Sequence, residues 1–229
     1  MSDAAISLLP LALLGALLGL DVVSFPQAMI SRPLVAATAA ATLLGDPARG
    51  LLVGATLEMF ALETLPFGAS RYPEWGSAAV VSGGLFAVHG DTTPGGLTFA
   101  VLAGLTVAWI GGWSMVQLRK FNASLARRRH DAVASGSKRV VEGLQVFGLT
   151  ADLVRGGALT ALGLGALRPI QRYVLDTWGS DPRVSRAIVV GIAASVAAGA
   201  VWKVVHAAPG ARWLLLAGLA VGLAILAVR

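Results

Sequence analysis

The sequence predicts an all-α membrane protein, a helical bundle with short re-entrant or broken hairpin segments. Hydrophobic residues make up 56% of the 229 residues and charged residues only 13%, whereas an average soluble chain has about 25% charged residues. Several long windows hold no charged residue, and the longest runs from Thr92 to Leu118. A soluble helical protein rich in alanine and leucine is the alternative, and these windows argue against it. We therefore treat residues 1–229 as a single integral membrane domain.

The first membrane segment covers residues 4–20, which are uncharged and rich in Leu and Gly. This length lies near the lower limit for a spanning helix, about 20 residues, and Pro10 predicts a kink. No basic residue precedes the segment and no clear cleavage site follows it, so we expect a retained helix rather than a cleaved signal. A polar loop, residues 21–27, follows. Its last residue, Gln27, belongs either to a binding site or to a solvated loop.

Two short apolar runs come next, residues 34–45 and 51–62, with a polar break between them. Each run is too short to span a bilayer as a helix. In transporters, apolar segments interrupted by Gly and Pro are the best sequence pointer to a binding site near the middle of the membrane. We predict a re-entrant or broken hairpin from Pro33 to Leu62, with Asp46 forming its turn.

Glu58 is a carboxylate inside the second apolar run, with Thr56 as its only polar neighbour. An ionisable residue at membrane depth is a functional hypothesis by default. Glu63 follows five residues later, which places the two carboxylates about 140° apart on a helix. They therefore do not form a paired acid and base. We predict that Glu58 lies in the pocket and Glu63 at a helix end.

The N-terminal membrane part, residues 4–118, ends with a short or tilted segment, residues 75–90, and the clearest spanning helix, residues 97–118. Residues 119–139 then hold seven basic residues against one acid, Asp131. The positive-inside rule predicts that these residues form a basic cytoplasmic loop. A nucleic-acid arm and a lipid-headgroup site are the alternatives. The basic residues lie beside membrane segments, which favours a topology signal, and we expect no nucleic acid partner.

Residues 140–229 form the C-terminal membrane part. Its first half is interrupted by charged residues and glycines, which predicts a second hairpin-like unit made of residues 140–153 and 156–167. Asp152 and Arg155 lie three residues apart, so we expect a structural ion pair on one helix face. The remaining regions are a polar loop or interfacial helix and two apolar segments: residues 168–186, 187–202 and 213–228.

Five short motifs occur in one order and at close spacing between residues 32 and 69. They are Arg32-Pro33-Leu34, Leu44-Gly45-Asp46, Gly50-Leu51, Gly54-Ala55-Thr56-Leu57-Glu58 and Gly68-Ala69. This pattern resembles the IIC subunit of the mannose/fructose/sorbose-type sugar phosphotransferase system. Gln27 corresponds to a Gln that commonly precedes the Arg-Pro pair in that family. Glu63 departs from the family, in which Gly commonly stands there, and this difference bears on the shape of the pocket.

The resemblance implies the sugar-translocating subunit of a phosphoenolpyruvate-dependent permease, a multi-pass protein of the bacterial inner (cytoplasmic) membrane. Such a subunit provides the sugar pocket and channel while a IIB subunit donates the phosphoryl group. The chain is then expected to have no catalytic or phosphorylated residue, no cofactor and no metal. The implied partners are a hexose or amino sugar, a IID membrane subunit, cytoplasmic IIA and IIB subunits and the lipid bilayer, in a homo- or hetero-oligomer. The implied substrate-binding residues are Glu58, Thr56, Gln27, Gly68 and Ala69.

Two other functions remain open from the sequence. A proton-coupled secondary transporter would use Glu58 as its proton carrier. A regulatory or scaffold remnant would assemble with a IID-like subunit without transporting sugar. The sequence contains no phosphate-binding P-loop and no zinc-binding HExxH motif, which excludes the common soluble enzymes that use them.

Overall fold

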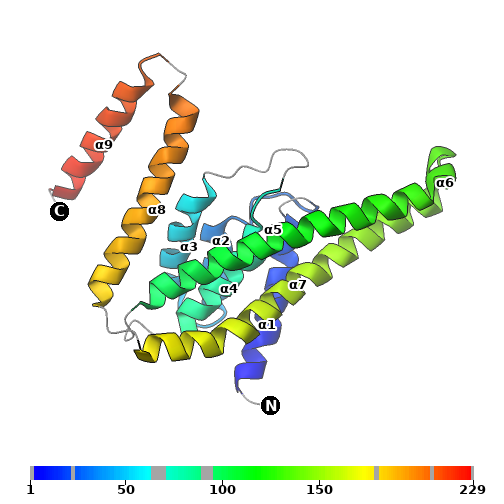
Figure 1. Ribbon diagram of the computed structural model, residues 1–229, viewed down its shortest axis with the longest axis horizontal. Coiled ribbons are helices and arrows are strands. Elements are labelled where there is room, and N and C mark those ends of the chain that lie inside the picture. The colour runs from blue at the N-terminus through cyan, green and yellow to red at the C-terminus, as the bar shows by residue number, and fades with distance from the viewer. Residues whose placement is uncertain are drawn as a thin grey trace.

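The computed structural model describes residues 3–21, 24–62, 71–88, 95–177, 181–206 and 209–227. All regular secondary structure in these ranges is helical, which confirms the all-α prediction. The helices form a bundle from which a long pair of helices and a separate C-terminal arm extend (Figure 1). In chain order they are α1 (Asp3–Asp21), α2 (Pro33–Thr42), α3 (Pro47–Ala61), α4 (Trp75–Val88), α5 (Gly96–Arg128), α6 (His130–Ala134), α7 (Lys138–Thr177), α8 (Pro182–Val205) and α9 (Ala211–Ala227).

The short helix α4 forms the centre of the bundle and packs against α1, α2, α3, α5 and α7. It is buried from Trp75 to Phe86, because small residues on every side let its neighbours come close. A Cβ atom added at Gly83 would lie 2.5 Å from the carbonyl oxygen of Ala37 in α2, and one at Gly76 would lie 2.4 Å from that of Leu18 in α1. The predicted short segment after residue 75 is confirmed as far as residue 88, where the described part ends.

The predicted hairpin is present as two antiparallel helices, α2 and α3, of 10 and 15 residues. Gly45 ends the first helix with a φ of +85°, a conformation that glycine adopts without strain. Asp46 caps the second helix: its Oδ1 accepts a hydrogen bond from the backbone N–H of Arg49 at 3.2 Å, and its Oδ2 pairs with the Arg49 guanidinium at 3.0 Å. The prediction that Asp46 forms the turn is therefore confirmed.

The prediction of a basic loop over residues 119–139 is wrong in its secondary structure. Helix α5 continues to Arg128, α6 follows directly, and α7 starts at Lys138. Residues 119–135 contain neither Gly nor Pro, and their many Ala, Leu, Lys and Arg residues favour a helix. The chain reverses only at Gly136, which has a φ of +72°. Arg127, Arg128, Arg129, Lys138 and Arg139 therefore lie on a helical tip at the far end of the α5–α7 pair (Figure 1), whereas Arg119 contacts Tyr72 at the bundle.

The predicted second hairpin is also wrong, because α7 is one helix of 40 residues. A glycine inside a helix costs only about 1 kcal/mol, and packing outweighs that cost here. A Cβ atom at Gly156 would lie 2.8 Å from the carbonyl oxygen of Gly15 in α1, so glycine is what allows α1 and α7 to meet. The polar stretch predicted as a loop or interfacial helix, residues 168–186, contains the end of α7 and the start of α8.

Helices α8 and α9 form the C-terminal arm. Helix α8 packs against α3 and α5, whereas α9 lies apart from the bundle (Figure 1). Among the described residues, α5 and the stretch Pro182–Lys203 of α8 are long and apolar enough to cross a membrane. Helices α1, α2, α4 and α9 contain shorter apolar stretches.

Candidate functional site

The hairpin is closed at its open end by an ion pair between Arg32 and Glu58. The guanidinium Nε of Arg32, the residue before α2, donates to Glu58 Oε1 at 2.6 Å, and its Nη2 contacts the same oxygen. Glu58 Oε2 accepts a hydrogen bond from the backbone N–H of Leu34 at 3.2 Å. The carboxylate thus lies at the N-terminus of α2, where unpaired N–H groups and the helix dipole favour a negative charge.

Both members of this ion pair remain accessible, because 26% of the Arg32 side chain and 21% of the Glu58 side chain are exposed. A carboxylate and a guanidinium placed side by side offer hydrogen-bond acceptors and donors to the same ligand. The sequence interpretation identified Glu58 and missed its partner. A signal was available: Arg32 and Glu58 each lie 13 residues from Gly45, and residues equally distant from the turn of an antiparallel hairpin meet.

Thr56 lies on the opposite face of α3 from Glu58, since two residues correspond to about 200° of helical rotation. Its buried hydroxyl donates to the carbonyl oxygen of Leu52 at 2.9 Å. The structure therefore does not bring Thr56 and Glu58 together in one pocket wall. Gly68, Ala69 and Glu63 lie outside the described residues.

Gln27 is exposed in the segment that joins α1 to the hairpin, and it has a φ of +60°. This segment folds around the buried carboxylate of Asp21, the last residue of α1. Asp21 accepts hydrogen bonds from the backbone N–H of Ala28 at 2.7 Å and from the N–H and hydroxyl of Ser31 at 2.9 and 2.8 Å. The sequence interpretation treated Asp21 only as the start of a polar loop. In the structure it orders the approach to Arg32.

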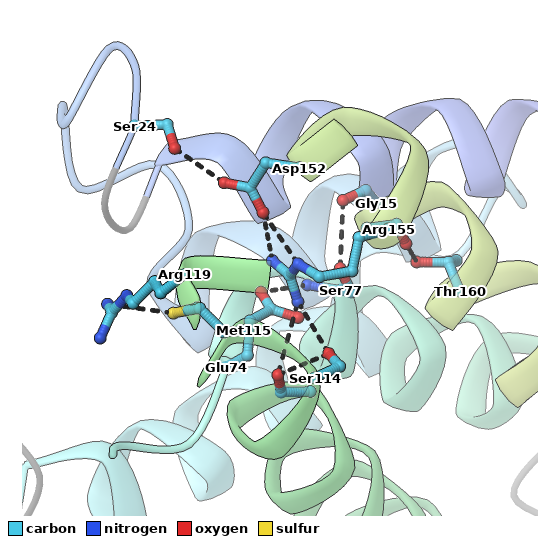
Figure 2. Close-up of polar contacts among 12 residues, drawn as sticks. Gly15, Ser24, Glu74, Ser77, Ser114, Met115, Arg119, Asp152, Arg155 and Thr160 are labelled. Carbon is cyan, nitrogen blue, oxygen red and sulfur yellow. Dashed lines mark hydrogen bonds and ion pairs between the residues drawn. The ribbon is translucent and has the colours of Figure 1, made fainter. Parts of the chain in front are cut away.

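A second polar group is buried between α1, α5 and α7 (Figure 2). Asp152 Oδ1 pairs with Arg155 Nε and Nη2, each at 2.8 Å, with side-chain exposures of 6% and 9%. The predicted ion pair is therefore confirmed. Ser24 donates its hydroxyl to Asp152 Oδ2 at 2.7 Å. Figure 2 shows Arg155 pointing toward Asp152 on one side and toward Ser114 on the other, and its Nη1 lies 3.3 Å from the Ser114 hydroxyl.

Glu74 lies beside this pair and is fully buried. Its Oε1 accepts a hydrogen bond from the backbone N–H of Ser77 at 3.1 Å, which caps the start of α4. Its own N–H donates to the carbonyl oxygen of Ala108 in α5 at 2.9 Å. Among the described residues, no hydrogen-bond partner reaches Oε2. The available signal was an acid placed directly before a charge-free helix, and the sequence interpretation did not use it.

A cavity of about 340 Å³ lies beside the start of α4. The guanidinium of Arg71 stands 5.0 Å from the centre of the Trp109 ring at this cavity, an arrangement typical of a cation–π contact. The residues that line the cavity are mainly aromatic and apolar: Phe60, Arg71, Tyr72, Pro73, Trp75, Leu105 and Trp109. Phe60, Tyr72 and Trp75, which come from separate segments of the chain, are thus brought to one cavity.

Comparison with known proteins identifies the family. The family model described as "PTS system sorbose-specific iic component" matches residues 5–182. The chain belongs to this family of phosphotransferase-system IIC components. The resemblance noted in the five motifs is thereby confirmed.

Among the described residues, no group of three or more His, Asp or Glu side chains could hold a metal ion.

Two curated relatives of this IIC chain are named for different sugars. The "PTS system mannose-specific EIIC component" of Escherichia coli (strain K12) is 26% identical over 137 residues, which cover 58% of this chain and 50% of that protein. The "PTS system sorbose-specific EIIC component" of Lacticaseibacillus casei is 34% identical over 70 residues, which cover 31% of this chain and 25% of that protein. The chain thus spans at most about half the length of these relatives.

A solved structure titled "Structure of membrane protein" has the same fold as this IIC chain. The TM-score is 0.77 at 19% sequence identity, and the match covers 100% of this chain and 92% of that one. At this identity the match establishes the fold alone. Together with the family match, it places the chain among helical membrane proteins.

Proposed function

We propose that this chain is the sugar-translocating membrane subunit of a phosphoenolpyruvate-dependent sugar phosphotransferase permease. We further propose that it crosses the bacterial inner membrane several times. The observation that supports this most directly is the accessible Arg32–Glu58 pair at the open end of a broken hairpin, in a chain of the IIC family. Charged groups held at membrane depth by short, interrupted helices are the usual composition of a transporter binding site.

The proposed chemistry is hydrogen bonding to a hexose or amino sugar. The Glu58 carboxylate accepts hydrogen bonds from sugar hydroxyls, and charged acceptors form shorter and stronger bonds than neutral ones. Arg32 donates to sugar oxygens from the other side of the same pair. The exposed amide of Gln27, together with Gly68 and Ala69, completes the proposed site. Thr56 lies on the buried face of the hairpin, where its hydroxyl donates to the Leu52 carbonyl of the same helix.

The proposed partners follow from the phosphotransferase assignment. A IID subunit shares the membrane complex, and the IIA and IIB subunits deliver the phosphoryl group from the cytoplasm, so this chain itself needs no phosphorylated residue. The basic helical tip of the α5–α7 pair is consistent with a cytoplasmic docking point, since Arg127, Arg128 and Arg129 are clustered there and the positive-inside rule places such clusters in the cytoplasm. The family match does not favour the proton-coupled or scaffold alternatives.

Uptake by reconstituted membranes tests the proposal. Membranes that contain this chain and its IID partner, supplied with IIA, IIB and phosphoenolpyruvate, should take up at least one sugar of a hexose and amino-sugar panel and release it phosphorylated. Membranes that contain the IID partner alone serve as the control. Uptake driven by a pH gradient without phosphorylation would favour the proton-coupled alternative, and assembly with IID without uptake of any sugar would favour the scaffold alternative.

A further inference from the structure

We infer that the chain has a second ligand subsite, between α5 and α7, that takes a neutral polyhydroxylated molecule of monosaccharide size. A cavity of about 300 Å³ lies there, where the α5–α7 pair leaves the bundle. It is lined by Ser24, Met115, Leu118, Arg119, Asn122, Leu144, Gln145, Gly148, Leu149 and Asp152. None of these residues belongs to the site proposed around Glu58. The assignment of the ligand as a transported sugar rests on the proposed function.

The first argument is the chemistry of the cavity wall. One acid, one guanidinium and two amides line the same space: Asp152, Arg119, Asn122 and Gln145. Arg119 would repel a cation, whereas the Asp152 carboxylate, already paired with Arg155, contributes hydrogen-bond acceptors rather than a free negative charge. A neutral molecule with several hydroxyl groups donates to the carboxylate and accepts from the guanidinium and amides at once. The apolar remainder of the wall, which includes Met115 and Leu149, suits the C–H face of a sugar ring.

The second argument is a polar atom in the cavity wall whose hydrogen-bonding capacity is unused among the described residues. Among the described residues, no hydrogen-bond partner reaches the buried Oδ1 atom of Asn122. An amide oxygen buried without a partner destabilises the protein, and a ligand hydroxyl in the cavity would supply the missing hydrogen bond. Gly148 keeps the space open opposite this amide, since a Cβ atom added there would already lie 3.4 Å from Asn122 Nδ2. The cavity is at the small end of the range for ligand pockets, about 300–1,000 Å³.

The third argument is the position of the cavity beside the aromatic one. Arg119 lines the polar cavity and Tyr72 lines the aromatic cavity. The Arg119 guanidinium lies 5.1 Å from the centre of the Tyr72 ring and donates to its hydroxyl oxygen. These two side chains therefore form a wall that the two cavities share. The polar cavity lies on the side of the basic tip, where a sugar that has passed the bundle would meet the cytoplasm.

Cysteine labelling tests the subsite directly, because the natural chain contains no cysteine. In the purified complex with IID, Gln145→Cys places a thiol in the cavity wall. Gly143→Cys places one on the same helix, where no atom lies within 4 Å of the added Cβ. D-Mannose and L-sorbose, the sugars named in the relatives, are the probes, with their phosphates as anionic counterparts. At a sugar concentration ten times the dissociation constant, labelling at position 145 should slow about tenfold, whereas labelling at position 143 should not change.

The second experiment fills the cavity with a larger side chain and repeats the labelling. Gly148→Leu combined with Gln145→Cys should remove the protection by sugar, whereas Gly143→Leu combined with Gln145→Cys should retain it.

Protection at position 145 should persist in Glu58→Ala, because the two sites are separate. Protection of a thiol near Glu58, introduced by Leu34→Cys at the residue whose N–H bonds Glu58, without protection at position 145 would overturn the second subsite and leave the proposed function standing. Protection by sugar phosphates alone would overturn the neutral ligand. Protection at neither position, together with failed uptake, would reject both proposals.

Discussion

At the scale of single residues, two sets of charged side chains in this IIC chain contrast: an accessible pair and a buried group. Arg32 and Glu58 are partly exposed, so their mutual attraction contributes only about 0–1 kcal/mol to stability, and their chemistry remains available to a ligand. Asp152, Arg155 and Glu74 are buried, and removing Arg155 leaves the Asp152 carboxylate buried without its ion-pair partner. The two groups should therefore respond differently to substitution.

Glu58→Gln should lower sugar affinity about tenfold, since a charged acceptor contributes roughly 1.4 kcal/mol more than a neutral one. Glu58→Ala should cost more, because Arg32 and the sugar hydroxyls then lose their acceptor entirely. The measurement is sugar affinity on purified, quantified complex. Asp46→Asn is the matched control, because Asp46 also pairs with an arginine and caps a hairpin helix, but at the turn. Unchanged affinity in both Glu58 variants would remove this residue from the site.

Arg155→Met should destabilise the fold by about 3–5 kcal/mol, because it leaves Asp152 buried without its ion-pair partner. The fully buried Glu74 beside it also loses a neighbouring positive charge. Thermal unfolding in detergent measures the loss. Lys138→Met is the control: it removes an exposed pair with Glu142, at 3.7 Å, and should change stability by only a few tenths of a kcal/mol. Equal effects of the two substitutions would contradict the energetic importance of burial here.

At the scale of elements, glycine has two opposite roles in these helices. In α4 it allows close packing, as at Gly83 against α2. In the second half of α7, Gly165 faces open space, with no atom within 4 Å of an added Cβ. At this position glycine makes no close packing contact, and its low helix propensity destabilises the helix. The many glycines of α7 suggested two short helices, yet α7 continues through them because Gly156 packs against α1.

Gly83→Ala should therefore destabilise the protein by about 1–3 kcal/mol, since its methyl group would overlap the Ala37 carbonyl. Gly165→Ala should have the opposite sign and stabilise by up to about 1 kcal/mol. Thermal unfolding of the two variants under the same conditions compares them. If both variants lost stability equally, the close α2–α4 contact would not be the cause.

At the scale of the whole molecule, the topology follows from the position of the basic tip. Ser135 lies at the turn between α6 and α7, beyond the basic end of α5, and the positive-inside rule predicts that it faces the cytoplasm. A thiol introduced by Ser135→Cys should react with a membrane-impermeant reagent only in inside-out vesicles. Leu9→Cys, on an exposed position inside α1, should react from neither side. Labelling of Ser135→Cys in intact cells would reverse the proposed orientation.

The sequence by itself determined the features that depend on neighbouring residues. Composition predicted a helical membrane bundle, and Asp46 predicted the turn of the hairpin, because a capping carboxylate acts within one helical turn. The spacing of Asp152 and Arg155 predicted their ion pair, because three residues place them on one face of any helix.

Only the tertiary structure decided what those features face. It paired Glu58 with Arg32 across 26 positions, buried Glu74 beside Arg155, and placed Thr56 on the opposite helix face from Glu58. It also joined residues predicted as two short segments into the single helix α7. Local propensities differ by at most about 1 kcal/mol per residue among residues other than proline. Packing across the bundle can outweigh them, and it depends on partners far away in the chain.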